Sequence, residues 1–333
     1  MSRKRTLYAL SLLALVLVTG MAIAQFGPPL RRHLANQIRQ LQLVPATEAP
    51  VGPNRVQIEV VGADRVISAN GIPDHKTGQF PNRGNPHQIE EQRYVYRIPA
   101  KPAAAARITP LSMQSFGICI NGVPFDPGAA EWYQGDPNGG WRYEALSGAV
   151  ALGIDANHAH VQPNGAYHYH GLPSGFLKEL NVRRTAHSPL IGWAADGFPI
   201  YAMYGYKDPQ DAESEIVELD SSFRLKTGKR PGGNQGPGGT YDGTFLADYE
   251  YVEGKGDLDA CNGRFGVTPE FPDGTYAYFL TQHWPVIPRA YRGTPSEDFV
   301  RGPRPEGNGR RGNNRGSGAA GPAGRGGFPP PRR

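Results

Sequence analysis

The sequence predicts a mainly β protein: a single β-rich domain of two related halves, sandwich- or barrel-like, with few short helices. The chain of 333 residues contains 44 glycines and 32 prolines, which favour turns and short strands over long helices. Runs of β-branched and aromatic residues recur between about residues 55 and 290, and turn residues bound them. Two motifs also occur twice, in the same order.

The first 24 residues have the pattern of a secretory signal peptide. Basic residues at the start precede an apolar run, and Ala22-Ile23-Ala24 is a typical cleavage site. An uncleaved membrane anchor is the alternative, because the run from Leu7 to Ala24 approaches spanning length. We therefore expect an exported protein, periplasmic or secreted, that touches a membrane only through this segment if it stays uncleaved.

The remaining chain divides into three parts. Residues 25–50 form a linker with a short amphipathic helix, indicated by apolar residues near helical spacing. Residues 51–300 form the β-rich domain. Residues 301–333 are rich in Arg, Gly and Pro and nearly free of apolar side chains, so they are expected to be disordered.

Charge argues against a nucleic-acid partner. The first 24 residues carry +3 and the last 33 carry +7, so the intervening residues carry a net charge of −5 within a total of +5. The folded part is therefore mildly acidic.

Local patterns place individual elements. Strands are expected within residues 55–62, 93–99, 116–122, 215–225, 244–254 and 275–284. Helices are expected in part of 131–148 and at 174–181. Residues 228–243, "GKRPGGNQGPGGTYDG", are expected to form a loop.

The duplication joins two pairs of segments. "GICINGVPFDP" (117–127) matches "GWAADGFPIYA" (192–202), and "QPNGAYHYHG" (162–171) matches "FPDGTYAYFL" (271–280). In the second pair, His168 corresponds to Ala277 and His170 to Phe279. The first half thus keeps a polar cluster where packing alone would accept Ala and Phe. This difference argues that the histidines are not merely exposed surface residues without a role.

Four histidines, His158, His160, His168 and His170, flank a "QPNG" turn. A type I turn followed by a left-handed Gly165 would set His160 opposite His168 and His158 opposite His170, with all four rings on one face. A two-residue Asn-Gly loop would instead set His160 opposite Tyr169 and split the cluster.

Imidazoles at cross-strand spacing form a natural divalent-metal site. Imidazole ligands suit zinc, copper, nickel and iron, and zinc and copper are the favoured candidates here. Asp155 and Asp196 are candidate ligands or catalytic bases, and His187 and His283 are further candidates. Two alternatives stay open: a His–Tyr hydrogen-bond network without metal, and metal-free acid–base chemistry by a His–Asp pair.

Export also changes what the two cysteines, Cys119 and Cys261, are expected to do. Outside the cytoplasm a pair of cysteines usually forms a disulfide, which here would close a long loop. Two free buried thiols are the alternative.

The chain resembles the YHYH-domain family through Tyr167-His168-Tyr169-His170, "SPLIGWAADGFPIYA" and "CNGRFGVTPEFPDGTYAYFLT". The resemblance covers about residues 90–290. It implies an exported, mainly bacterial protein and supplies no settled biochemical activity.

Three functions fit the sequence. The favoured one is a metal-dependent hydrolase or oxidase acting on a small molecule or an envelope polymer, with Tyr167 and Tyr169 as packing residues. The second is a carbohydrate- or protein-binding module, in which Trp132, Tyr133, Trp141 and Tyr143 stack on sugars. The third is a metal storage or delivery protein.

Overall fold

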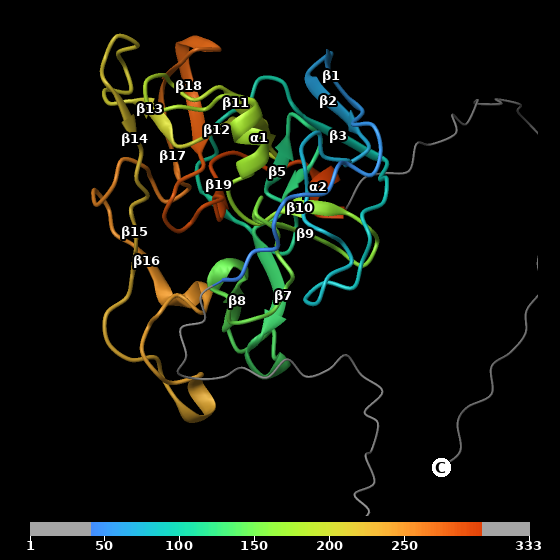
Figure 1. Ribbon diagram of the computed structural model, residues 1–333. Helices are drawn as coiled ribbons and strands as arrows, with labels where there is room; N and C mark the ends of the chain where they lie inside the picture. Colours follow the sequence, from blue (N-terminus) through green and yellow to red (C-terminus); the bar gives the residue numbers. More distant parts are fainter. Residues whose placement is uncertain (1–40, 302–333) are drawn as a thin grey trace, which may run out of the picture.

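The computed structural model describes residues 41–301 (Figure 1). The expected signal peptide, most of the amphipathic helix and the C-terminal tail lie outside these residues. Residues 41–50 contain no helix, and Val44 and Glu48 form isolated bridges to Asp155 and Thr77. Within the described part, strands dominate and the two α-helices are short, so the predicted fold class is confirmed. None of the described helices is long and apolar enough to cross a membrane.

The first half of the described chain contains these strands: β1 (Val56–Val61), β2 (Asp64–Ala69), β3 (Tyr94–Pro99), β4 (Thr109–Pro110), β5 (Gly117–Cys119), β6 (Pro124–Phe125), β7 (Gly128–Trp132), β8 (Arg142–Glu144), β9 (Ala159–Val161) and β10 (Tyr167–Tyr169).

The second half contains helix α1 (Ser174–Glu179), then β11 (Leu190–Ala194), β12 (Pro199–Tyr201), β13 (Tyr204–Tyr206), β14 (Ile216–Glu218), β15 (Phe223–Leu225), β16 (Tyr249–Tyr251), β17 (Gly263–Thr268), β18 (Phe271–Phe279), β19 (Ala290–Tyr291) and helix α2 (Glu297–Arg301).

The largest sheet has a two-fold internal symmetry. Its strand order is β17-β18-β12-β11-β5-β6-β10-β9, and Figure 1 shows the second-half strands β18 and β12 to one side of β5 and β10. Each half contributes two antiparallel pairs joined by one parallel pairing, β6 with β10 and β12 with β18. The halves meet where β5 pairs with β11. The sheet stays open, so it is not a barrel.

The register of the two halves agrees residue by residue. Phe125 pairs with Tyr169 in one parallel ladder, and the equivalent Ile200 pairs with Tyr278 in the other. The hydroxyl of Tyr278 donates to Asp196 at 2.6 Å, while that of Tyr169 accepts from Asn121 at 2.9 Å. Asn121 and Asp196 are equivalent positions of the first motif, so the duplication read from the sequence is a duplication of structure.

Strand alternation separates two faces of this sheet. On one face, the four YxY tyrosines pack in the main hydrophobic core, Tyr167 and Tyr169 from the first half and Tyr276 and Tyr278 from the second. We call this the tyrosine face. The opposite face carries His160 and His168 in the first half, and we call it the histidine face.

Local predictions had mixed outcomes. Helix α1 confirms the helix expected at 174–181, and residues 228–243 form a loop with one short 3-10 turn. The helix expected within 131–148 is wrong. That segment contains only two 3-10 turns, while β7 and β8 pair as a hairpin around the turn at residues 137–140, because proline and glycine interrupt any longer helix.

The expected disulfide is absent. Cys119 and Cys261 are both buried free cysteines. Cys119 ends β5 and Cys261 precedes β17, and three strands of the sheet lie between β5 and β17. Adjacent strands are about 4.8 Å apart, so the two thiols are far beyond bonding reach.

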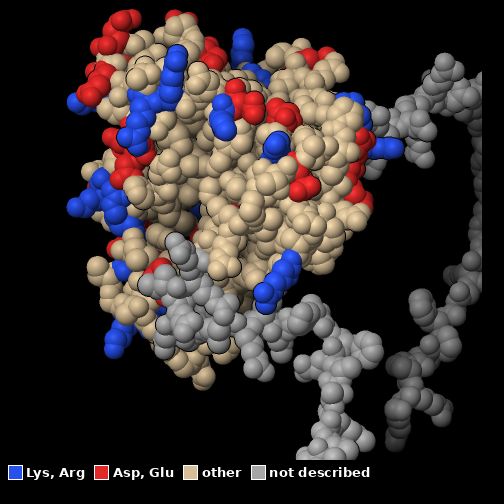
Figure 2. Space-filling model, viewed as in Figure 1, with Lys and Arg blue, Asp and Glu red and all other residues tan. Residues whose placement is uncertain are grey.

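The charges of the described surface are mixed. On the face drawn in Figure 2, acidic and basic side chains alternate around uncharged areas.

The central strands approach closely because glycines occupy matching places. An added Cβ at Gly117 would collide with the carbonyl oxygen of Trp193 and lie 2.8 Å from Ala194 Cα; one at Gly192 would lie 2.7 Å from the carbonyl oxygen of Ile118. Both neighbours are backbone of the opposite strand, which cannot move without opening the ladder.

We predict that Gly117→Ala lowers the free energy of unfolding by about 1–3 kcal/mol, the usual cost of overpacking. The matched control is Gly52→Ala, where the nearest neighbour of an added Cβ is Glu91 Oε1 at 3.8 Å. Urea denaturation of both variants measures the difference. Equal stability of the two variants would contradict the close packing of β5 and β11.

Candidate functional site

The site begins with the hairpin that joins β9 to β10. The Gly165 amide donates to Gln162 O at 2.9 Å, and Gly165 has a positive φ of 82°. The Gln162 amide donates to Ala166 O at 3.0 Å, and His160 pairs with His168. The register predicted from a type I turn followed by a left-handed glycine is therefore confirmed, and the two-residue loop is excluded.

Three histidines converge on the histidine face. One ring nitrogen from each of His160, His168 and His170 lies within 4.8 Å of the other two. His168 Nε2 and His170 Nε2 are 3.1 Å apart. Two nitrogens bound to one zinc ion at 2.0–2.1 Å in tetrahedral geometry are about 3.4 Å apart, so this spacing fits a shared metal. We call these residues the histidine triad.

Backbone carbonyls fix the tautomers of two rings. His160 Nδ1 lies 3.0 Å from Leu152 O, and His168 Nδ1 lies 3.1 Å from Ala166 O. Because a carbonyl oxygen only accepts, each Nδ1 carries the proton and each Nε2 presents a lone pair. This is the arrangement that orients metal-binding imidazoles in proteins.

The third ring has an unsatisfied nitrogen. His170 Nδ1 is buried and makes no hydrogen bond of good geometry to the described residues. If its Nε2 donates to His168 Nε2, Nδ1 is left as an unused acceptor. If Nδ1 carries the proton instead, two Nε2 lone pairs face each other at 3.1 Å. In either tautomer the triad is incompletely satisfied by protein groups alone.

Burial keeps His168 and His170 neutral. His168 and His170 are only 3% and 1% exposed. Burial lowers the pKa of His168 to about 4. Burial also lowers the pKa of His170 well below its usual value, with smaller contributions from His160, His168 and Arg289 and a weak opposing one from the Pro127 carbonyl. Neutral imidazole is the form that ligates a metal.

The second half shows what this face looks like without a site. The positions equivalent to His160, His168 and His170 carry Arg264, Ala277 and Phe279. Ala277 and Phe279 belong to a buried hydrophobic cluster, and the Arg264 guanidinium lies over the Phe279 ring. The same backbone frame therefore packs an apolar core in one half and three imidazoles in the other.

The fourth predicted ligand, His158, does not join the triad. The backbone pairs as expected, since the His170 amide donates to His158 O at 2.7 Å. However, His158 has a positive φ of 54°, which turns its side chain away from the strand direction. Its Nδ1 lies 2.8 Å from Leu172 O, and the ring lines a separate cavity of about 380 Å³. The equivalent Asn262 has the same conformation, with φ 56°.

The two aspartates proposed as ligands or bases lie elsewhere. Asp155 is fully buried and accepts from the Tyr167 hydroxyl at 2.7 Å and from the Gly78 amide at 2.8 Å. Asp196 accepts from the Tyr278 hydroxyl and from the Gly293 amide. Both carboxylates therefore hold tyrosines on the tyrosine face, and neither is placed with the triad.

These contacts also extend the role of the tyrosines beyond packing. Tyr169 joins a buried network that sequence reasoning missed, in which His75 Nε2 lies 2.6 Å from its hydroxyl oxygen. His75 comes from the segment before β3, outside the duplication, so no local pattern links it to Tyr169.

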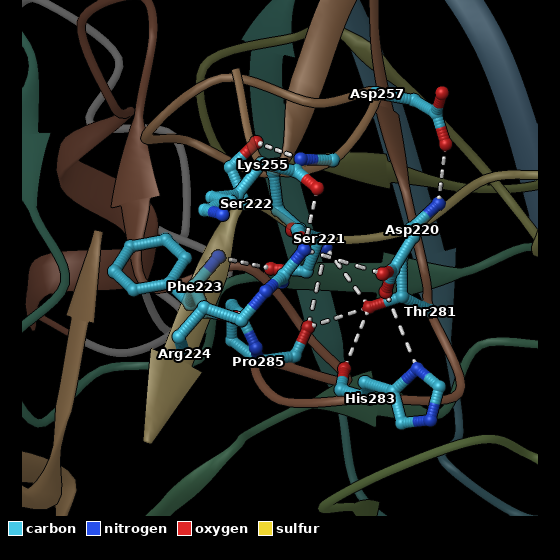
Figure 3. Close-up of polar contacts among 12 residues, drawn as sticks. Asp220, Ser221, Ser222, Phe223, Arg224, Lys255, Asp257, Thr281, His283 and Pro285 are labelled. Carbon is cyan, nitrogen blue, oxygen red and sulfur yellow. Dashed lines mark hydrogen bonds and ion pairs between the residues drawn. The ribbon is translucent and has the colours of Figure 1, made fainter. Parts of the chain in front are cut away.

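The remaining histidine candidates are also separate from the triad. His187 packs against Tyr201, Tyr206 and Phe279 in the second half. His283 is exposed and contacts Asp220 at 3.2 Å, in a set of polar contacts that ties residues 220–224 to 255–257 and 281–285 (Figure 3).

The aromatic residues proposed as a sugar platform are largely packed. Trp141 and Tyr143 surround the buried Phe245, with ring centroids 5.6 and 4.7 Å from it, and Arg142 lies over the Trp132 ring. Tyr133, Trp141 and Tyr143 all pack in the second hydrophobic cluster, so they do not form an open stacking surface.

One charged residue beside the triad was not singled out from the sequence. Asp126 directly follows β6, and its amide donates to Tyr169 O at 2.8 Å. Since Phe125 pairs with Tyr169 on the tyrosine face, Asp126 falls on the histidine face. The duplication could have identified this residue. The second half has Tyr201 at the position equivalent to Asp126, so this position differs between the halves in the same way as the histidine positions.

Two cavities meet at the triad. A cavity of about 740 Å³ is bordered by His168, Asp126 and Gln162. A smaller one of about 300 Å³ is bordered by His160, His168 and Gln162. His168 contributes to both linings, so the two cavities adjoin at this residue, whereas His170 borders neither of them.

The pKa directions predict how the metal-free protein responds to acid. The folded-state pKa of His168 is lowered to about 4 from 6.5, so the unfolded chain binds protons first as the pH falls. The resulting stability is present above pH 6.5 and is lost towards pH 4, by about 3 kcal/mol for this residue. Urea denaturation between pH 7.5 and 4.5 measures it.

The matched variant is His168→Ala with His170→Phe, which copies the residues of the second half. It should show a shallower loss of stability than the parent chain over the same range. Parallel pH profiles for the two proteins would contradict a neutral, buried state of His168 and His170.

Comparisons with known proteins place this site in a family. The family described as YHYH protein matches residues 95–293, which include both motif pairs and the whole triad. No curated protein and no solved structure matches the chain. Since the match covers more than half of the chain, the protein belongs to the YHYH family.

Proposed function

We propose that this protein binds one divalent metal ion, zinc or copper, through His160, His168 and His170, and that it acts outside the cytoplasm as a metal-dependent hydrolase or oxidase. The observation that carries the proposal is the convergence of the three imidazoles, with the Nε2 lone pairs of His160 and His168 set by carbonyl contacts at Nδ1. The unsatisfied His170 nitrogen supports the same conclusion.

The number of ligands supports a reactive site over a closed structural one. Structural zinc sites use four protein ligands, whereas catalytic sites keep three and leave a position for water or substrate. Because the His158 side chain points away, the triad supplies three histidine ligands. A metal held here would polarise a bound group or lower the pKa of a bound water, and both adjoining cavities are bordered by His168.

The same observations weigh against the other two functions. A storage or delivery site needs rapid exchange, but two of the three ligands are almost fully buried. A sugar-binding platform needs exposed rings, but most of the candidate aromatic residues pack around Phe245. The N-terminal signal pattern supports action outside the cytoplasm.

Elemental analysis tests the proposal. We predict about one equivalent of zinc or copper in the full-length chain, expressed with its own leader and purified without a histidine tag. His168→Ala with His170→Phe should contain none and should not take up metal on titration, while keeping its circular dichroism spectrum.

His158→Asn is the control for nearby histidines. It removes an imidazole that is close to the triad in sequence but lines a different cavity, and it copies Asn262, which has the same backbone conformation. Metal content should therefore equal that of the parent chain. No metal in the parent protein, before or after titration, would reject the metal site, and loss of metal in His158→Asn would reject this choice of ligands.

A further inference from the structure

The larger cavity beside the triad has an unusual charge composition. It is bordered by polar and aromatic side chains, with His168 of the triad among them and Tyr94, Tyr96 and Phe299 contributing the rings. Asp126 is the acidic residue in this lining, and no Lys or Arg is among the described residues that form it. The lining therefore carries a carboxylate and no basic side chain, while Arg142 and Arg289 act on its charge from behind the lining residues.

Asp126 is buried but weakly satisfied. It is only 8% exposed. Oδ2 accepts from Gln162 Nε2 at 3.2 Å, and Oδ1 accepts from the Gly128 amide at 3.4 Å. Both contacts are long, and a carboxylate has room for about four donors.

The two arginines that act on the charge of Asp126 donate their hydrogen bonds to other groups. The Arg142 guanidinium donates to Ala129 O and Ser112 O. The Arg289 guanidinium donates to Pro127 O and to the Glu144 carboxylate. Among the ion pairs of the described residues, none includes Asp126. Arg142 and Arg289 act on the Asp126 charge, since both contribute to lowering its pKa, but neither donates a hydrogen bond to it. A buried carboxylate that no cation contacts directly is costly, and a bound cation would offset that cost.

The wall near Asp126 is aromatic. Tyr94 and Tyr96 stack with centroids 5.5 Å apart, and Tyr96 and Phe299 stack at 4.1 Å. The Asp126 charge contributes to raising the pKa of both tyrosines, after the larger effect of burial, so carboxylate and rings share one environment.

We propose that this cavity binds a cationic nitrogen, an amine or a guanidinium, against Asp126, and that the substrate of the triad is an amine-bearing molecule whose reacting group reaches His168. The part concerning the substrate rests on the proposed metal function, whereas binding of an amine at Asp126 requires no metal. In the second half, Tyr201 replaces Asp126 and bonds to Thr268 and Glu270, so the acid occurs only beside the triad.

Two further observations agree with this assignment. Burial raises the pKa of Asp126 to about 6, against opposing contributions from the Gly128 amide, Arg142, His160 and Arg289. A bound cation would favour the ionised carboxylate. Gln162 follows His160 on the same strand face and reaches Asp126, so it links the acid to the triad.

Calorimetry with defined amines tests the proposal on the full-length chain at pH 7.5. The probes are cadaverine, glucosamine and Nα-acetyl-lysine amide, for polyamines, amino sugars and lysyl peptides respectively. The neutral and anionic controls are 1-pentanol, glucose and glutarate. At least one amine should bind at submillimolar concentration, while the controls should not.

Asp126→Asn preserves the shape of the side chain and removes the charge. Affinity for the bound amine should fall by at least about tenfold, or 1.4 kcal/mol. Glu131→Gln changes an acidic residue that borders the smaller cavity, and it should leave affinity unchanged. Circular dichroism and metal content are measured on the same samples.

Three outcomes would overturn the proposal: none of the amines binds below about 1 mM, 1-pentanol binds as well as cadaverine, or Asp126→Asn keeps full affinity. The two proposals can fail separately. If the protein contains no metal but still binds amines through Asp126, the metal function is rejected and the cation site is retained.

Discussion

The register of the β9–β10 hairpin is the constraint on which the candidate site depends. A left-handed Gly165 closes the turn and sets His160 opposite His168. A shift by one residue would move the tyrosines to the histidine face and the histidines into the core. The tyrosine hydroxyls oppose such a shift, because Tyr167 and Tyr169 bond to Asp155 and Asn121 on the other side of the sheet. The polar contacts of one face thus position the imidazoles of the other.

The duplicated frame explains how a polar site exists within a β sheet. Both halves keep the same strand pairings. Each half also has a residue with positive φ at the same position before its outer hairpin, His158 in the first half and Asn262 in the second. They differ on the histidine face, where one half has Tyr201, Ala277 and Phe279 in a hydrophobic cluster. The tyrosine face supplies most of the core in both halves. The histidine face of the first half therefore does not have to supply an apolar core, and it can carry polar side chains.

Much of this frame could be predicted from the sequence. The repeated motifs predicted two related halves, and Pro163, Asn164 and Gly165 predicted the hairpin register. The conformation of His158 could not be predicted, because a positive φ in a non-glycine residue depends on tertiary contacts. Asp126 joins the site through the parallel pairing of β6 with β10, a nonlocal contact that no spacing in the chain encodes. The helix expected within 131–148 failed because proline and glycine favoured a hairpin.

The central claim is that three imidazoles from one hairpin share a metal ion. Anomalous diffraction from crystals of the full-length protein, recorded at the zinc and copper absorption edges, tests it most directly. The account predicts one peak within bonding distance of nitrogens of His160, His168 and His170, with His158 uninvolved. A peak beside His158 or on Asp155, or clear density for three unliganded rings in metal-soaked crystals, would contradict it.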